Sequence, residues 1–278
     1  PGPGRRRGGL RPRPRPALKG GPAMNIHPRD AELVGGALLT EPDATEEDAR
    51  SARRVTAVYV YEWPVRAWHW MNALAILVLC VTGYFIGSPP QIGGWGEASE
   101  HFLFGWIRFA HFAAAYIFAA GFLGRLYWAF VGNHHARQMF YLPVWSGRWW
   151  KEVLFELKWY AFIEPHPKKY IGHNPLAQVA MFTFITLGSV FMIVTGFALY
   201  AEGQQAGGWA DALFGWVIPA VGGNSMTLHT LHHFGMWAIV IFVIIHVYAA
   251  IREDIMSRQS MVSTMISGHR MFKDDDPD

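Results

Sequence analysis

The sequence predicts an all-α integral membrane protein, folded as a bundle of four transmembrane helices. Its 278 residues are 51% hydrophobic and only 16% charged, which is too apolar for an ordinary soluble domain of this length. Four stretches are long and apolar enough to cross a hydrocarbon core about 30 Å thick, which takes roughly 20 helical residues. No Asp or Glu lies within them. The predicted spans are residues 67–87, 106–131, 177–200 and 227–251.

The spans belong to a predicted domain of residues 58–268, which lies between a basic N-terminal arm (1–57) and an acidic C-terminal tail (269–278). The arm begins without Met and is first dominated by Pro, Gly and Arg, so we expect it to be disordered. A basic arm could bind nucleic acid or a membrane surface. We instead interpret residues 1–23 as upstream sequence with Met24 as the possible true start, and we expect no nucleic-acid partner.

The connecting segments predict the topology. The segments after the first and third spans contain acidic residues such as Glu97, Glu100 and Glu202, but no Lys or Arg. Both ends of the predicted domain are basic near the spans, and the middle segment is basic as well. The positive-inside rule therefore places both termini and the middle segment in the cytoplasm. The basic residues of the middle segment are Arg137, Arg148, Lys151, Lys158, Lys168 and Lys169.

Within the middle segment, "WWKEVLFELKWYAFIE" (149–164) alternates aromatic and charged residues at helical spacing. It is too polar to span a membrane. Such an amphipathic stretch predicts an interfacial helix on the cytoplasmic side. We expect it to anchor the protein and assign no chemistry to it.

Histidines stand out in the apolar spans, where polar side chains are costly and often functional. His232 and His246 in the fourth span are fourteen positions apart, so they share one helix face at depths that differ by about 21 Å. His69 lies near the cytoplasmic start of the first span, and His111 near the opposite surface at the start of the second. Depth therefore pairs His69 with His246 and His111 with His232.

Two facing neutral imidazoles in a helix bundle are the arrangement that holds a six-coordinate haem iron. We therefore expect two non-covalent, bis-histidine haems b about 20 Å apart. Iron held from both sides has no open position, so such haems carry electrons. His229 and His233 lie about 100° and 140° around the helix from His246 and are not expected to be ligands. The single cysteine, Cys80, excludes covalent haem attachment through C-x-x-C-H.

Three arginines are candidate partners for haem propionates, which need cations near the membrane surfaces. Arg66 and Arg108 each precede a proposed ligand by three residues, and Arg125 follows His111 by fourteen. Arg66 fits equally well as an anchor whose charged end reaches the membrane surface.

Two interpretations without haem remain open from the residues alone. A metal transporter or intramembrane metalloprotease also uses buried histidines, but a hydrolytic zinc site usually adds a carboxylate base and an H-E-x-x-H spacing, which this chain lacks. A plain helical anchor, with histidines as polar links between helices, does not account for the matched depths on three helices.

Two long stretches, "RAWHWMNALAILVLCVTG" (66–83) and "HTLHHFGMWAIVIFVIIH" (229–246), closely resemble signature stretches of the b-type cytochrome subunit of membrane-bound nickel–iron uptake hydrogenases. The resemblance continues through "IRFAHF", "RLYWAFVGN", "IGHNPLAQ", "VFMIVTGFALY", "GGNSM" and "IREDIMS". It covers about residues 58–268. The family's ligand histidines carry over onto His69, His111, His232 and His246.

The resemblance implies a dihaem subunit of the bacterial inner membrane that passes electrons from hydrogen oxidation to the quinone pool. It implies periplasmic partners, the hydrogenase small and large subunits. The last iron–sulfur cluster of the small subunit would feed the His111/His232 haem, and the His69/His246 haem would serve a quinone near the cytoplasm. The chain lacks the Cys-x-x-Cys pairs of a nickel–iron site, so we expect a non-catalytic electron-transfer subunit of a hydrogen:quinone oxidoreductase complex.

The stretch "YIGHNPLAQ" (170–178) is the candidate quinone site, through His173, Asn174 and Gln178. A quinone needs a hydrogen-bond partner and a proton donor as it is reduced, and a similar Asn-containing stretch occurs in the cytochrome subunit of membrane formate dehydrogenases. Asn followed by Pro is also an ordinary helix start. A cytochrome subunit of formate dehydrogenase or of another periplasmic dehydrogenase is the alternative function, although "GHNP" and "GGNSM" favour hydrogenase.

Overall fold

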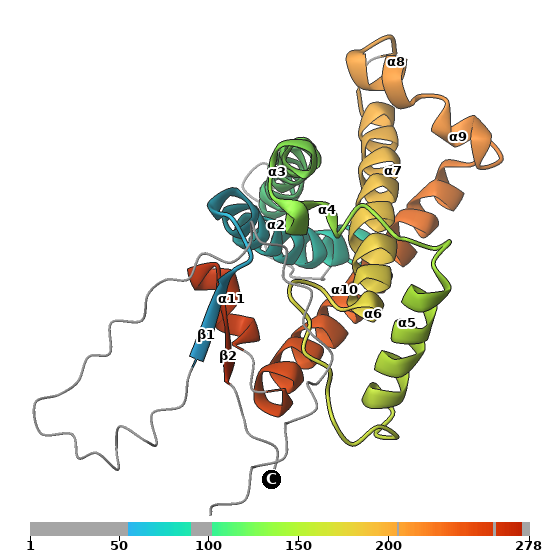
Figure 1. The fold of residues 1–278 in the computed structure, drawn as a ribbon. Helices are drawn as coiled ribbons and strands as arrows, with labels where there is room; N and C mark the ends of the chain where they lie inside the picture. The colour runs from blue at the N-terminus through green and yellow to red at the C-terminus, as the bar shows by residue number, and fades with distance from the viewer. Residues whose placement is uncertain (1–54, 90–101, 205, 258–259, 274–278) are drawn as a thin grey trace, which may run out of the picture.

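The computed structural model describes residues 55–89, 102–204, 206–257 and 260–273 (Figure 1). The predicted disordered arm up to residue 54, and the acidic Glu97 and Glu100, lie outside the described residues. The elements in chain order are β1 (Val55–Tyr59), α2 (Trp63–Gly87), α3 (Leu103–Val131), α4 (His134–Arg137), α5 (Gly147–Tyr160), α6 (Pro175–Ala180), η2 (Met181–Leu187), α7 (Gly188–Glu202), α8 (Trp209–Phe214), α9 (Val217–Ala220), α10 (Ser225–Met256), α11 (Met261–Ser267) and β2 (His269–Lys273).

The four predicted spans are confirmed as four helices that are long and apolar enough to cross a membrane. Each of them is longer than its predicted span. α10, for example, begins where Asn224 accepts a hydrogen bond from the backbone nitrogen of Met226 at 2.9 Å. The buried share of the apolar window is 17% in three of the helices and 28% in the third span, so most of each window remains accessible. The chain is a multi-pass membrane protein. The spans are Trp63–Gly87, Leu103–Val131, Pro175–Glu202 and Ser225–Met256.

The third span combines three segments, because α6 and α7 are joined by a π-helical turn, η2. The hydroxyl of Thr186 in this turn donates to the backbone oxygen of Met139 at 2.9 Å. This bond links the span to the connection that follows α3. The sequence pattern does not predict the π-helical turn, since its apolar residues continue without a break.

The spans pack as two pairs, α2 with α3 and α7 with α10, and α10 also contacts α2 (Figure 1). Glycines mark the close approaches. A Cβ on Gly121 of α3 would lie 2.6 Å from the Cε atom of Met71 on α2, and one on Gly235 of α10 would lie 2.5 Å from the Sδ atom of Met192 on α7. Small residues of this kind let membrane helices approach closely.

The two ends of the described chain meet in an antiparallel pair of strands, with Val58 opposite Arg270 (Figure 1). The predicted domain boundary 57/58 falls inside β1, and the boundary 268/269 coincides with the start of β2. Arg270 is 2% exposed and donates to the backbone oxygens of Tyr170 and Gly172 at 2.9 and 2.8 Å. The strands are therefore bound to the connection between α3 and α6, and both ends of the domain lie on the side of that connection.

The predicted amphipathic helix is observed as α5, but it ends at Tyr160 rather than at residue 164. Phe162 has a φ of 60°, a left-handed conformation that cannot continue a right-handed helix. One face of α5 is buried against the protein through Trp149, Val153, Glu156 and Trp159. At the end of α10, Glu253 accepts a hydrogen bond from Trp159 Nε1 at 3.2 Å, which holds α5 against the fourth span.

Candidate functional site

His111 and His232 line one cavity of about 740 Å³ between α2, α3, α7 and α10. This volume lies within the roughly 300–1,000 Å³ of pockets that enclose cofactors. We call His111 and His232 the α3–α10 pair. Glycines lie against both rings: a Cβ on Gly83 would be 3.3 Å from Cε1 of His111, and one on Gly196 would be 3.2 Å from Cε1 of His232.

Each ring of the α3–α10 pair contacts a threonine hydroxyl that the sequence analysis does not single out. Thr82 Oγ1 lies 2.9 Å from Nδ1 of His111, and Thr195 Oγ1 lies 2.8 Å from Nδ1 of His232. Both threonines stand in the same tripeptide, Val-Thr-Gly, at 81–83 and 194–196. The repeated tripeptide was the available signal, and its meaning depends on which helices face each other.

His229 and His233 line the same cavity, although helix geometry places them on other faces of α10. The two rings have different partners. Trp237 Nε1 donates to Nε2 of His233 at 3.1 Å, so this nitrogen already has a partner. Nδ1 of the exposed His229 lies 3.0 Å from the backbone oxygen of Ser225, on its own helix. Neither ring contacts a threonine of α2 or α7.

His69 of α2 and His246 of α10 face each other with their ring centroids 6.3 Å apart. We call them the α2–α10 pair. A metal bound to one nitrogen of each ring at roughly 2 Å, the imidazole distance known for zinc, would place the ring centres about 6 Å apart. The observed spacing fits one metal ion between the rings. His246 is also stacked on Phe242, with centroids 5.7 Å apart.

Several buried donor atoms around the α2–α10 pair have no hydrogen-bond partner within the described residues, namely Arg66 Nε, Trp68 Nε1, His69 Nδ1, Arg125 Nε and Arg125 Nη1. Arg125 is 4% exposed, and its guanidinium lies over the rings of Trp68 and Phe140 at 5.6 and 5.3 Å. Its Nη2 atom donates to the backbone oxygen of Ala136 at 2.7 Å. Buried donors without acceptors are costly, and the carboxylates of a haem would supply acceptors.

The other two predicted arginines differ in their surroundings. Arg108 is exposed and lines the cavity of the α3–α10 pair. Arg66 donates from Nη1 to the backbone oxygen of Ile266, which links the start of α2 to α11. Arg66 therefore has a structural contact in addition to its unpartnered Nε atom.

The predicted quinone residues lie together where the chain enters α6, but their polar groups are already engaged. Asn174 accepts from the backbone nitrogen of Ala177 at 2.6 Å and so caps α6, as the Asn-Pro pair predicts. Gln178 accepts from Trp149 Nε1 at 3.0 Å. The backbone nitrogen of His173 donates to Gln138 at 3.0 Å. Burial and nearby cations lower the pKa of His173 to about 3, so its ring is neutral.

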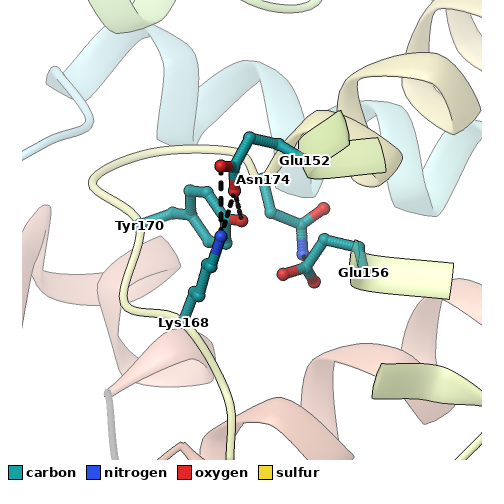
Figure 2. Close-up of polar contacts among 5 residues, drawn as sticks. All are labelled: Glu152, Glu156, Lys168, Tyr170 and Asn174. Atoms are coloured by element: carbon teal, nitrogen blue, oxygen red, sulfur yellow. Dashed lines mark hydrogen bonds and ion pairs between the residues drawn. The ribbon is translucent and has the colours of Figure 1, made fainter. Parts of the chain in front are cut away.

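Figure 2 shows a polar cluster beside Asn174 that the sequence analysis misses. Asn174 Nδ2 donates to the Glu156 carboxylate at 3.0 Å, while Lys168 and Tyr170 contact Glu152 at 2.9 and 2.8 Å. Glu156 is 1% exposed, and its Oε1 atom has no partner among the described residues. Burial, and next the Glu253 carboxylate, raise the pKa of Glu156 to about 7.

Within the described residues, no group of three or more His, Cys, Asp or Glu side chains is placed to hold a metal ion. A transporter or hydrolase site would need such a group. A haem iron, by contrast, needs only two protein ligands, such as a pair of imidazoles.

Comparison with known proteins decides the family. The family model described as prokaryotic cytochrome b561 matches residues 60–268. The chain belongs to the prokaryotic cytochrome b561 family. A "Probable Ni/Fe-hydrogenase B-type cytochrome subunit" of Rhodobacter capsulatus is 68% identical over 252 residues, which are 91% of this chain and 96% of the relative. Relatives with similar names from Azotobacter vinelandii and Escherichia coli K12 are 62% and 50% identical, over 84% and 79% of this chain and 97% and 93% of their own lengths.

Membership in this cytochrome b561 family supports haem b as the cofactor and agrees with the resemblance found in the sequence. The family match also spans all four membrane helices.

Proposed function

We propose that this cytochrome b561 is the membrane subunit of a nickel–iron hydrogenase and transfers electrons from hydrogen oxidation to a quinone. The observation that carries the proposal is the arrangement of four histidines as two pairs on three membrane helices. The names of the relatives, at up to 68% identity, supply the partner. The subunit itself is non-catalytic, and the hydrogenase large and small subunits oxidise hydrogen to two protons and two electrons.

Four histidines hold the two haems b in this proposal. His111 and His232 hold one, and His69 and His246 hold the other. A haem bound by two histidines carries one electron at a time. Of the cationic residues, Arg125 is best placed to receive a carboxylate of the second haem, because two of its buried donors are unpartnered within the described residues. Arg108 and Arg66 are the further candidates.

The orientation in the bacterial inner membrane follows from charge. The strands at the two ends of the domain are bound to the basic connection between α3 and α6, which supports a common cytoplasmic location for these segments. The α3–α10 pair then lies on the periplasmic side, where the hydrogenase small subunit docks. We propose α5 as the interfacial helix on the cytoplasmic side. The folded domain includes both strands, and only residues outside them belong to the arm and tail.

The quinone binds near the start of α6, at the end of the molecule that holds the α2–α10 pair. Quinone reduction to quinol takes two electrons and two protons. His173, Asn174 and Gln178 remain the predicted contacts, and we add Glu156 as a group that can hold a proton there. Its carboxyl is bonded to Asn174 and has a pKa of about 7, close to the value that suits proton transfer at neutral pH.

Affinity purification of the tagged chain from hydrogen-grown cells tests the proposal. We expect the nickel–iron large and small subunits to co-purify, and hydrogen gas to reduce the haems and an added quinone. Recovery of a molybdopterin subunit instead would favour the alternative, a cytochrome subunit of formate dehydrogenase or of another periplasmic dehydrogenase. A chain that binds no haem would be a plain anchor, and the proposed function would fail.

A further inference from the structure

We propose that Thr82 and Thr195 are positioning residues that set the tautomer of His111 and His232, and that they give the haem of the α3–α10 pair the lower of the two reduction potentials. This inference rests on the proposed function, because it assumes that the two pairs hold haem. It is carried by hydrogen bonds that differ between the two pairs.

The direction of the hydrogen bonds follows from the short contacts of the hydroxyls. Thr82 Oγ1 lies 2.6 Å from the backbone oxygen of Val78, and Thr195 Oγ1 lies 2.7 Å from that of Phe191. Two oxygens this close need a proton between them, and the hydroxyl has only one proton to give. Each hydroxyl therefore donates to its own helix and accepts from the histidine.

The histidine must then carry its proton on Nδ1. A neutral imidazole protonated at Nδ1 presents an unprotonated Nε2, which is the nitrogen that can bind a metal. The same arrangement occurs at both rings, with Thr82 on α2 serving His111 on α3 and Thr195 on α7 serving His232 on α10. The glycine that follows each threonine leaves space for the ring.

The α2–α10 pair lacks this arrangement. Nδ1 of His69 is buried and has no hydrogen-bond partner within the described residues, and His246 is stacked on Phe242. A cation, Arg125, is buried beside Trp68, the residue that precedes His69. The two pairs therefore have the same ligand type but different surroundings.

Both differences make the potential of the α3–α10 haem lower than that of the α2–α10 haem. A hydrogen bond accepted from Nδ1–H makes the imidazole a stronger donor to the metal, which stabilises the ferric form and lowers the potential. A buried cation stabilises the less positive ferrous form and raises the potential. Second-shell hydrogen bonding and local charge are established determinants of haem potential. Electrons would therefore pass downhill from the α3–α10 pair to the α2–α10 pair, toward the proposed quinone site.

Redox titration of the haem spectrum in the purified complex tests this inference with Thr82→Val and Thr195→Val. Valine keeps the shape of threonine but removes the hydroxyl. We expect two haems per chain and an upward shift of the lower midpoint potential alone. Second-shell partners change metal affinity by roughly tenfold or more, and a tenfold change in the ferric-to-ferrous preference corresponds to about 59 mV for one electron.

Serine substitutions and a third threonine provide the controls. Thr82→Ser and Thr195→Ser keep the hydroxyl and should keep the wild-type potential. Thr230→Val removes a hydroxyl that lines the same cavity and, among the described residues, donates to the backbone oxygen of Met226 rather than contacting a histidine, so it should change neither potential.

The outcomes separate this inference from the proposed function. Wild-type protein without haem would end both. Two haems with unchanged potentials in the valine variants, a shift of the higher potential instead, or an equal shift in the serine variants would overturn only the role of the threonines. If a valine variant loses its haem, restoration by serine supports the positioning role, and failure of serine to restore it contradicts that role.

Discussion

The two histidine pairs differ in what surrounds rings of the same kind. In the α3–α10 pair, a threonine hydroxyl is hydrogen-bonded to each ring and a glycine lies against each ring. Both rings line a cavity of about 740 Å³. The α2–α10 pair has aromatic stacking, unpartnered buried donors and a buried arginine. Ligand identity alone therefore does not define an electron carrier, because hydrogen bonds and charge around identical ligands can separate their reduction potentials.

The largest effect is expected from removing a ligand. An alanine variant of any one of His69, His111, His232 and His246 should lower the haem content from two per chain to one, because a single imidazole does not retain a six-coordinate haem. Haem quantification in purified protein measures this. His229→Ala and His233→Ala should retain both haems. Loss of a haem in either control, or retention of two haems in a ligand variant, would contradict the pairing.

The next largest effect should come from filling the space beside a ring of the α3–α10 pair. Gly83→Ala or Gly196→Ala brings a Cβ to 3.3 or 3.2 Å from the ring, and overpacking of this kind costs roughly 1–3 kcal/mol. The electron paramagnetic resonance signal of one haem should change while the other stays constant. Gly124→Ala, which meets nothing within 4 Å, is the matched control. Equal changes in both signals would show that the glycines do not serve one pair.

A smaller effect is expected from removing the charge beside the α2–α10 pair. Arg125→Leu should lower only the higher midpoint potential, by tens of millivolts, because the loss of a buried positive charge destabilises the ferrous form. Arg108→Leu should affect only the other haem. Redox titration of both variants measures the shifts, and a fall in the lower potential of Arg125→Leu would remove the proposed contrast.

The smallest effect concerns pH and Glu156. Its pKa is raised in the folded protein to about 7 from the usual 4.5, so the folded state binds more protons than the unfolded state between these values. Stability should therefore fall as pH rises from about 4.5 to about 7. Glu156→Gln removes this contribution. The thermal unfolding midpoint of the variant should therefore exceed that of the wild type, and the difference should be largest above pH 7. A pH-independent difference between the two proteins would show that this carboxyl does not titrate in that range.

The spans and their histidines were predictable because each is a local property of the chain. A run of apolar residues defines a membrane helix by its length, and a histidine inside it stands out at once. Helical geometry then relates His232 to His246 without reference to other helices. The structure confirms the four helices and brings the two proposed pairs each to a common place, although it leaves the iron ligation itself a prediction.

The features that the sequence analysis misses all depend on contacts between distant segments. In the sequence, Thr82 and Thr195 are indistinguishable from threonines that bond only to their own helices. Their contacts with His111 and His232 form because α2 packs against α3 and α7 packs against α10. The strands β1 and β2 pair across more than 200 residues of sequence. From the sequence, Glu156 is one of several charged residues on an amphipathic helix. Its hydrogen bond with Asn174 forms only because α5 packs against the start of α6.

Cryo-electron microscopy of the detergent-purified complex tests whether the two histidine pairs each bind a haem. We expect two macrocycles in the membrane domain, one with its iron between the Nε2 atoms of His111 and His232 and the other with its iron between those of His69 and His246. Density for a single macrocycle, or an iron bound by His229, His233 or a non-histidine side chain, would contradict the account.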